Sequence, residues 1–143
     1  MATINASVSI SSNIMSYPIS INKTMTMKKQ QSCNGLDETS GLRTKKFVNT
    51  DDVAVIEADE YTSSSSKAHK VYMRNTSSDK ANFFYVAMHA NTAEQNTDRT
   101  IGKLYGQDWM LLCYSGTTNI TVASNTTDTQ YLEYMVFADG MAS

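Results

Sequence analysis

The side chains that most often bind metals or act as nucleophiles are few in this chain: two histidines, His69 and His89, and two cysteines, Cys33 and Cys113. A structural zinc site uses four such ligands at characteristic spacings, and a catalytic site uses three. The histidines lie 20 residues apart, no Cys-x-x-Cys pair occurs, and neither cysteine is close to a histidine in the sequence. The sequence therefore predicts no metal site and no thiol nucleophile activated by a histidine.

Hydroxyl and carboxylate groups are numerous but lack the surroundings that catalysis needs. No Gly-x-Ser-x-Gly nucleophile turn is present. Carboxylates cluster at Asp37-Glu38, Asp51-Asp52 and Glu57 to Glu60, in polar stretches where the raised pKa of a glycosidase acid is hard to obtain. Gly102 and Gly106 are not followed by the Gly-Lys-Ser/Thr of a phosphate loop, and we expect Gly106 to supply a positive φ in a turn. The sequence predicts a protein that is not an enzyme and uses no cofactor.

Size and charge narrow the class of partner. The 143 residues suit one domain, 18% of them are charged, and the net charge is -2. Basic residues pair only at Lys28-Lys29 and Lys45-Lys46, with Arg43 nearby, whereas nucleic-acid binders usually carry an extended basic face. The sequence shows no signal-peptide pattern and no apolar stretch of the roughly 20 residues that span a membrane. We expect no nucleic acid and no membrane as partner, and two free thiols, with Cys113 in the core.

Alternating apolar and polar residues predict strands through most of the chain. Val8 and Ile10 alternate with serines, and the apolar residues from Ile19 to Met27 share one parity, so they lie on one face of a strand. Further strands are expected at residues 53–56, 70–74, 82–88, 100–105, 109–114, 120–122 and 131–137. Residues 70–74 and 82–88 flank a polar turn, which predicts a β-hairpin, and the second of them is apolar on both parities, which predicts a central strand.

Turn residues separate these segments at short intervals. The chain contains 17 serines, 17 threonines and 11 asparagines, residue types that favour strands, turns and strand ends. The predicted fold is therefore all-β, a single-domain antiparallel β-sandwich or jelly-roll-like barrel of about eight or nine strands with long polar loops. The whole chain, residues 1–143, forms this one domain in the prediction.

A region suited to contact with other proteins lies at the N-terminal side. Residues 1–46 comprise the first strands and a polar stretch, residues 28–46, that has no periodicity and reads as an extended arm or loop able to reach a neighbouring subunit. Methionine is an adaptable residue on binding surfaces. The candidate interaction residues are Met25, Met27, Lys28, Lys29, Arg43, Lys45, Lys46 and Trp109.

Eight tyrosines and one tryptophan keep a second class of function open. A sugar-binding face presents exposed aromatic rings, whereas most of these rings lie within apolar strands, where core packing is expected. Binding of a carbohydrate is therefore the alternative rather than the first hypothesis.

Two parts of the chain carry a resemblance to a known group of proteins. The first joins Ser7 to Ser12 with Ser20 to Met27, and the second joins Ile101 to Met110 with the strand Leu132 to Phe137. They resemble small virion structural proteins of tailed bacteriophages, especially those of marine cyanobacteria, in which a Gly-x-Leu-Tyr-x-Gly-Asp-Trp/Phe hairpin and a closing Leu-Glu-Tyr-Met-Val-Phe strand recur. This chain departs from that pattern in having Gln107 between Gly106 and Asp108.

The resemblance implies a protein without enzymatic activity that is present in many copies on a virion. It implies a capsid decoration or cement protein bound to the major capsid protein, with a neck, tail or fibre-associated structural protein as the alternative. A carbohydrate-binding module on such a virion would serve host recognition. We expect a homo-oligomer as well, such as a trimer or a ring, because assemblies of identical modules are usually closed and symmetric.

Overall fold

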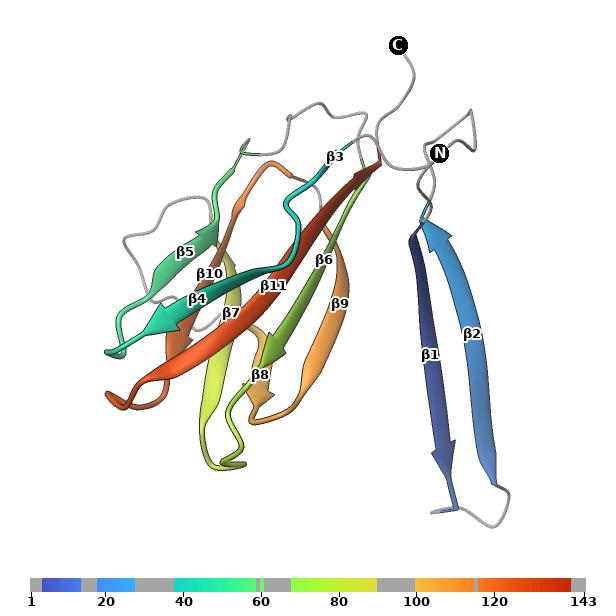
Figure 1. Ribbon diagram of the computed structural model, residues 1–143, viewed down its shortest axis with the longest axis horizontal. Coiled ribbons are helices and arrows are strands. Elements are labelled where there is room, and N and C mark those ends of the chain that lie inside the picture. Colours follow the sequence, from blue (N-terminus) through green and yellow to red (C-terminus); the bar gives the residue numbers. More distant parts are fainter. Residues whose placement is uncertain are drawn as a thin grey trace.

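The computed structural model describes residues 4–13, 18–27, 38–58, 60, 68–89, 100–114 and 116–139. These residues form eleven strands in three sheets and no helix. Figure 1 shows two of the sheets packed as a sandwich, with the third, a two-stranded hairpin, standing beside it. The predicted all-β sandwich is confirmed, and the described strands do not close into the barrel that was its alternative.

The hairpin consists of β1 (Ile4–Ser12) and β2 (Ile19–Met27), paired antiparallel along their whole length from Ile4 opposite Met27 to Ser12 opposite Ile19. Both strands follow the alternation seen in the sequence. This pairing brings the two N-terminal segments together without any strand of the sandwich between them.

One layer of the sandwich, here called the four-stranded sheet, contains in spatial order β5 (Val53–Ile56), β10 (Asn119–Ser124), β7 (Phe83–His89) and β8 (Thr100–Tyr105). All its pairs are antiparallel. The central position predicted for the segment at residues 82–88 is confirmed, because β7 pairs with β10 on one side and β8 on the other.

The other layer, the five-stranded sheet, is built around β11 (Gln130–Asp139). One edge of β11 pairs with β3 (Glu38–Thr39) and β4 (Arg43–Phe47), and its other edge pairs with β6 (Ala68–Asn75), which is followed by β9 (Trp109–Tyr114). The strand β9 therefore forms one edge of this sheet, and β3 and β4 share the opposite edge.

The core lies between the two sheets and takes apolar side chains from both. The largest hydrophobic side chains that are fully buried are Phe84, Ile56, Met73, Ile120, Leu132, Val71, Val86, Val122 and Val136. The rings of Phe47 and Phe84, one from each sheet, lie with their centroids 4.9 Å apart. Each such side chain stabilises the fold by about 1.5–3 kcal/mol relative to an exposed position, and none of them comes from the hairpin.

The predicted hairpin of residues 70–74 and 82–88 is wrong. The two strands are β6 and β7, and they belong to different sheets. The turn between them carries the chain across the sandwich instead of folding it back within one layer. Each strand turns one set of alternate apolar residues toward the core, and it can do so in either sheet. The local pattern therefore cannot distinguish a hairpin within one sheet from two strands in different sheets.

The predicted arm at residues 28–46 is corrected in its second half. From Glu38 onward the chain forms β3 and β4, which pair with β11, as in the pairs Thr39–Phe137 and Lys46–Tyr131. The side chains of β4 are exposed except for Phe47, which enters the core, and one buried residue in five produces no visible periodicity. Residues 28–37 lie outside the described residues.

The two layers are joined at one end of the sandwich by Asn75, which is fully buried at the end of β6. Its Nδ2 donates to the carbonyl oxygens of Asn82 at 3.2 Å and Leu104 at 3.0 Å. Its main chain exchanges hydrogen bonds with the turn between β8 and β9, donating to the oxygen of Asp108 at 3.0 Å and accepting from the nitrogen of Gln107 at 2.9 Å. A buried side-chain amide is tolerated only when it is hydrogen bonded in this way. Asn75 therefore fixes how the turn between β6 and β7 meets the turn between β8 and β9.

Gly106, in the same turn, is required by close packing. A Cβ at this position would lie 2.1 Å from the carbonyl oxygen of Asp79 and 2.9 Å from that of Ser77. The positive φ of the turn, 70°, belongs to the next residue, Gln107. The expectation that Gly106 supplies the positive φ is therefore wrong, and its role is to let the turn at residues 77–79 approach.

Candidate functional site

The N-terminal hairpin separates most of its side chains by chemical type between its two faces. In its register, cross-strand partners share a face. One face is apolar except for Lys23 and Ser12, and it includes Ala6 opposite Met25, Val8 opposite Lys23 and Ile10 opposite Ile21. The other face, called the polar face, carries only Ser, Thr and Asn, namely Asn5, Ser7, Ser9, Ser11, Ser20, Asn22, Thr24 and Thr26.

The polar face is held together by its own hydroxyl and amide groups. The hydroxyls of Ser7 and Thr24 are 2.9 Å apart, and Thr26 Oγ1 donates to Asn5 Oδ1 at 2.8 Å. These cross-strand bonds fix the register of the hairpin, because a one-residue slip would reverse the two faces. The polar face thus suits solvent, and the apolar face is left to find another environment.

Much of the apolar face is open to solvent. Val8, Ile10, Ile21 and Met25 are between 36% and 49% exposed. A two-stranded hairpin alone is at best marginally stable in water, and it gains stability when a third layer or strand covers it. Contiguous exposed apolar surface of this kind marks sites of protein contact. The hairpin is therefore the first candidate for a binding element.

A second apolar surface lies on the side of the five-stranded sheet that faces away from the core, here called the outer face. Because Met110, Leu112 and Tyr114 of β9 point toward the core, the alternate residues Trp109, Leu111 and Cys113 point outward. Trp109 is 53% exposed. From β6 and β11 the outer face receives Lys70, Tyr72, Arg74, Tyr131, Glu133, Met135 and Phe137.

Tyr72 and Glu133 form the polar centre of the outer face. The Tyr72 hydroxyl donates to Glu133 Oε1 at 3.0 Å. Partial burial raises the pKa of Tyr72, the hydrogen bond to Glu133 and its negative charge raise it further, and the nearby Arg74 opposes them. Arg74 itself donates from Nη2 to Gln107 Oε1 at 2.8 Å. A phenol with a raised pKa stays protonated at neutral pH, so Tyr72 serves as a hydrogen-bond donor that positions Glu133.

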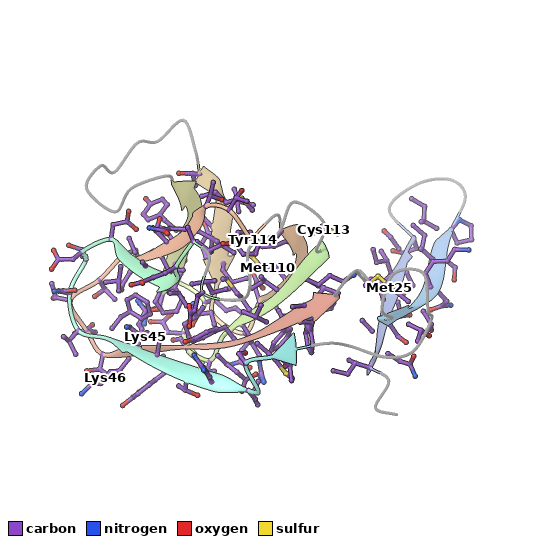
Figure 2. The ribbon with its side chains drawn as sticks, turned by 90° about the horizontal axis from the view of Figure 1, so that it is seen from above. Met25, Lys45, Lys46, Met110, Cys113 and Tyr114 are labelled. Atoms are coloured by element: carbon purple, nitrogen blue, oxygen red, sulfur yellow. The ribbon has the colours of Figure 1, made fainter. Side chains whose placement is uncertain are left out.

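A cleft of about 480 Å³ lies between the outer face and the first strand of the hairpin. Residues 4–7 of β1 line one side, and Tyr72, Trp109, Leu111 and Phe137 are among those lining the other. Figures 1 and 2 agree that the hairpin stands on the side of the sandwich where β9 lies. The hairpin and the outer face are thus neighbours in the molecule, but they do not close on each other.

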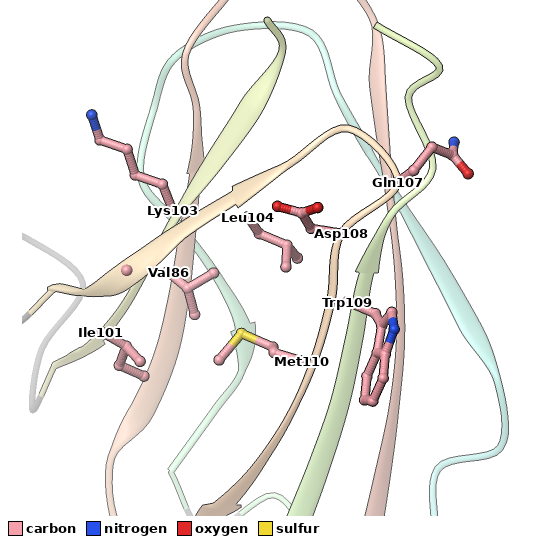
Figure 3. Close-up of a pocket in the computed structure, with 9 residues that line it drawn as sticks. Val86, Ile101, Lys103, Leu104, Gln107, Asp108, Trp109 and Met110 are labelled. Atoms are coloured by element: carbon pink, nitrogen blue, oxygen red, sulfur yellow. The ribbon is translucent and has the colours of Figure 1, made fainter. Parts of the chain in front are cut away.

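A second hollow, of about 400 Å³, opens between the edge strands β8 and β9. In Figure 3, Val86, Leu104 and Met110 turn toward it, whereas Lys103 and Trp109 point away. Asp108 at its rim accepts a hydrogen bond from the main-chain nitrogen of Tyr105 at 3.2 Å. The hollow has an apolar floor, so it can accommodate an apolar group.

An aromatic cluster lies on the side of the four-stranded sheet that faces away from the core. The ring centroid of Phe83 lies 5.0 Å from that of Tyr85 and 5.1 Å from that of Tyr105. Lys103 Nζ lies 4.8 Å from the centroid of Phe83 and 5.3 Å from that of Tyr85. Tyr85 and Tyr105 are each 40% exposed. Core packing was expected for most tyrosines, but Tyr85 and Tyr105 point away from the core. The strand β7 is apolar on both parities, so its pattern alone does not show which parity faces inward.

The predicted interaction residues do not form one surface. Arg43, Lys45 and Lys46 lie on the edge strand β4, exposed, and Arg43 pairs with Glu60 at 3.5 Å. Figure 2 shows Lys45 and Lys46 at one side of the sandwich and Met25 on the hairpin at the other. Trp109 lies on β9, at the opposite edge of the five-stranded sheet from β4.

Three of the predicted residues are only partly or not at all described. Met27 ends β2, and its side chain is not among those described. Lys28 and Lys29 lie outside the described residues, as does Cys33. Of the eight candidates, Met25 and Trp109 therefore lie on the two apolar surfaces, the hairpin and the outer face.

The groups considered for chemistry are dispersed. His69 lies in β6 and His89 in β7, strands of different sheets. No group of three His, Cys, Asp or Glu side chains that could hold a metal ion occurs among the described residues. Cys113, expected in the core, is exposed on the outer face. Because the residues around Cys113 are apolar on both parities, the sequence does not show which of them face the core. Tyr114 is the one that points inward, and the Tyr114 hydroxyl donates to the carbonyl oxygen of Thr118.

No protein-family model matches this chain, and no curated protein matches it either. Within the part of the chain that the structure describes, there is no helix long and apolar enough to cross a bilayer.

Proposed function

We propose that this chain is a non-enzymatic structural protein of a bacteriophage virion that acts through protein–protein contact, as a capsid decoration protein on the major capsid lattice. A neck or tail component is the alternative position. The observation that carries the proposal is the N-terminal hairpin, whose face with Val8, Ile10, Ile21 and Met25 is apolar, exposed and outside the core.

Two further features support a role in assembly. The hairpin holds its register through its polar face, so it presents the apolar face as a defined surface rather than as a loose tail. The outer face of the five-stranded sheet adds an exposed tryptophan, a residue type enriched at the energetic centres of protein interfaces. The virion setting itself comes from the resemblance of the two sequence regions described above.

The proposal is tested by cosedimentation of the purified chain with assembled capsids, and with tails, of the phage that encodes it. We expect the chain to pellet with particles and the variant Ile10→Asp with Ile21→Asp to bind at least about tenfold more weakly, because both changes place a charge on a buried contact. The matched control is Ser9→Asp with Asn22→Asp, which adds the same charge to the polar face. If neither capsids nor tails retain the wild-type chain, the virion role is wrong.

The aromatic cluster of Phe83, Tyr85 and Tyr105 favours one second candidate, recognition of a carbohydrate. Exposed rings with a nearby cation can stack on sugar faces and hydrogen bond to hydroxyls. A glycan array probed with the full chain tests this candidate. A specific signal that is lost in Tyr85→Ala, and kept in Tyr131→Ala on the other sheet, would establish it; an array without signal would exclude this candidate for the glycans displayed.

A further inference from the structure

We infer that a second copy of this chain covers the hairpin, and that two copies exchange hairpins, so that the apolar face of each hairpin packs on the outer face of the other copy's five-stranded sheet. This inference rests on the proposed function in assembly: the hairpin joins two copies, and the resulting dimer is the unit that contacts the virion. It joins the hairpin, with Ile10 and Ile21, to the sheet surface that carries Trp109 and Leu111.

The two surfaces match in chemistry and in form. Each is one side of a β-sheet. The opposite side of the hairpin is polar and suits solvent, and the opposite side of the five-stranded sheet packs in the core. Two sheets pack face to face about 10 Å apart when their facing side chains are apolar. The hairpin contributes aliphatic side chains and methionine, and the outer face contributes Trp109, Leu111, Tyr131 and Met135.

Within one chain the two surfaces are not closed on each other. The cleft of about 480 Å³ separates β1 from the outer face, and both Ile10 and Trp109 stay about half exposed. A packed interface would leave no space of this size, because protein interiors contain few voids larger than a water molecule. The hairpin of a second copy can approach the outer face independently, so that contact can close without leaving the cleft.

The connection between the hairpin and the sandwich is long enough for exchange. Ten residues, 28–37, join β2 to β3. Ten residues can span up to about 35 Å when extended, which is comparable to the length of the hairpin itself. Exchange of an identical element between two copies is a route to a dimer that requires no new surface.

The area of contact distinguishes exchange from the simpler packing of two hairpins on each other. Two nine-residue strands present a face of about 30 Å by about 10 Å, or about 300 Å². Two hairpins packed together bury about 600 Å² in total, below the range of stable interfaces, whereas reciprocal exchange buries about 1,200 Å², at the lower end of that range. The same comparison favours a two-fold pair over the trimer or ring expected above. Two neighbouring copies in a ring share one hairpin-to-sheet contact of about 600 Å², whereas the two copies of an exchanged dimer share two such contacts.

Charge points the same way. Lys23 is the one charged residue on the apolar face of the hairpin, and Glu133 is the one carboxylate on the outer face among the described side chains. Hairpin-to-hairpin packing would enclose two Lys23 ammonium groups in one small interface, where like charges are costly. Exchange keeps the two Lys23 ammonium groups in separate contacts, each with an outer face that carries Glu133 as well as Lys70 and Arg74.

The oligomeric state of the full chain is the first test. Sedimentation velocity over a concentration series, with Cys33→Ser as background, is expected to show a dimer. Ile10→Asp with Ile21→Asp, and separately Trp109→Ser, should each raise the dissociation constant at least about tenfold. The controls, Ser9→Asp with Asn22→Asp and Tyr85→Ser on the other sheet, should leave it unchanged. A chain that is monomeric at every concentration, or a dimer insensitive to Trp109→Ser, overturns the exchange.

The exposed thiol of Cys113 allows the contact to be located. In the same background, Val8→Cys and Ile10→Cys are treated with a mild thiol oxidant, and we expect at least one of them to form a disulfide-linked dimer through Cys113. Ser9→Cys, on the polar face, should not, because a disulfide requires Cβ atoms about 3.8 Å apart. Loss of the crosslink in Cys113→Ser supports the exchange, and a crosslink that survives it shows hairpins packed on each other and overturns it.

These outcomes separate the two proposals. A monomer that still binds capsids through its hairpin would disprove the exchange and leave the proposed function intact. A hairpin-exchanged dimer that binds no virion protein would support the exchange and disprove the virion role.

Discussion

Gly106 lies where the turn between β8 and β9 meets the turn at residues 77–79. The carbonyl oxygens of Asp79 and Ser77 occupy the space that a side chain would need. These are main-chain atoms held by hydrogen bonds, among them Gln107 Nε2 to Ser77 O at 2.8 Å, so they cannot move aside cheaply. The absence of a side chain at this one position therefore allows the two sheets to be joined at this end.

We expect Gly106→Ala to lower the free energy of unfolding by about 1–3 kcal/mol, the usual cost of overpacking. Urea denaturation followed by circular dichroism measures it. Gly102→Ala is the matched control, since a Cβ there meets nothing within 4 Å, and it should be neutral or slightly stabilising because alanine has less backbone entropy to lose. Equal effects of the two substitutions would contradict the packing role of Gly106.

Tyr72 gives the outer face a dependence on high pH. Its burial, and then the hydrogen bond to Glu133 and the charge of that carboxylate, raise its pKa above the ordinary value of 10.0. The folded chain therefore binds the phenolic proton more tightly than the unfolded chain does. The resulting stabilisation is fully present below the ordinary pKa and is lost as the pH rises through the raised one.

We expect the free energy of unfolding of the wild type to fall more steeply above about pH 10 than that of Tyr72→Phe, which has no phenol to ionise there. Urea denaturation at a series of alkaline pH values is the measurement. Tyr131→Phe, which removes one phenol from the same face, controls for the general effect of losing a tyrosine. Parallel curves for the wild type and Tyr72→Phe would show that the contact with Glu133 has no such effect.

At the scale of elements, the hairpin and the sandwich differ in how they are stabilised. The strands β6 and β11 pair on both edges and face the core, whereas β1 and β2 pair only with each other. Stability is distributed accordingly, and regions with few buried apolar contacts open locally at small free-energy cost. Edge β4 is protected differently, because its exposed Lys45 and Lys46 discourage pairing with another sheet.

Amide hydrogen exchange should therefore separate the two parts. At low protein concentration, we expect the amides of β1 and β2 to exchange at least about tenfold faster than those of β6 and β11, because their opening does not require global unfolding. Higher concentration should slow exchange in the hairpin alone as a partner covers it. Protection of the hairpin equal to that of β11 in a monomer would mean that it docks within its own chain.

At the scale of the whole molecule, the described part of the chain consists of a sandwich that holds the apolar core and a hairpin that contributes no side chain to it. Removal of residues 1–27 is therefore expected to leave the sandwich folded. Its free energy of unfolding should change by less than about 1 kcal/mol, since no core contact is lost. Urea denaturation of the truncated and full chains in dilute solution compares them, and loss of the cooperative transition on truncation would show that the hairpin supports the fold.

The sequence by itself determined that the chain is all-β and which segments form most of its strands, all except β3 and β4. Alternation of period two is a local property, so Val8 with Ile10, the residues from Ile19 to Met27 and the final strand could be recognised from neighbours alone. The central position of β7, paired at both edges, also agreed with the prediction from its apolar residues on both parities, although its outward parity, which includes Tyr85, is not covered. Part of the candidate site followed as well, in Met25 and Trp109.

Only the tertiary structure decided which strands pair and which parity faces the core. The residues of β6 and β7 satisfy a hairpin and a crossover equally well, and the choice was made by contacts with β11, β9 and β10, which are distant in sequence. In the run from Trp109 to Tyr114 both parities are apolar, so its pattern could not place Cys113 and Trp109 outside and Tyr114 inside. Strand pairing, and the choice of which side chains face the core, depend on long-range contacts that leave no local periodicity. For that reason only the tertiary structure shows the outer face and the two faces of the paired hairpin.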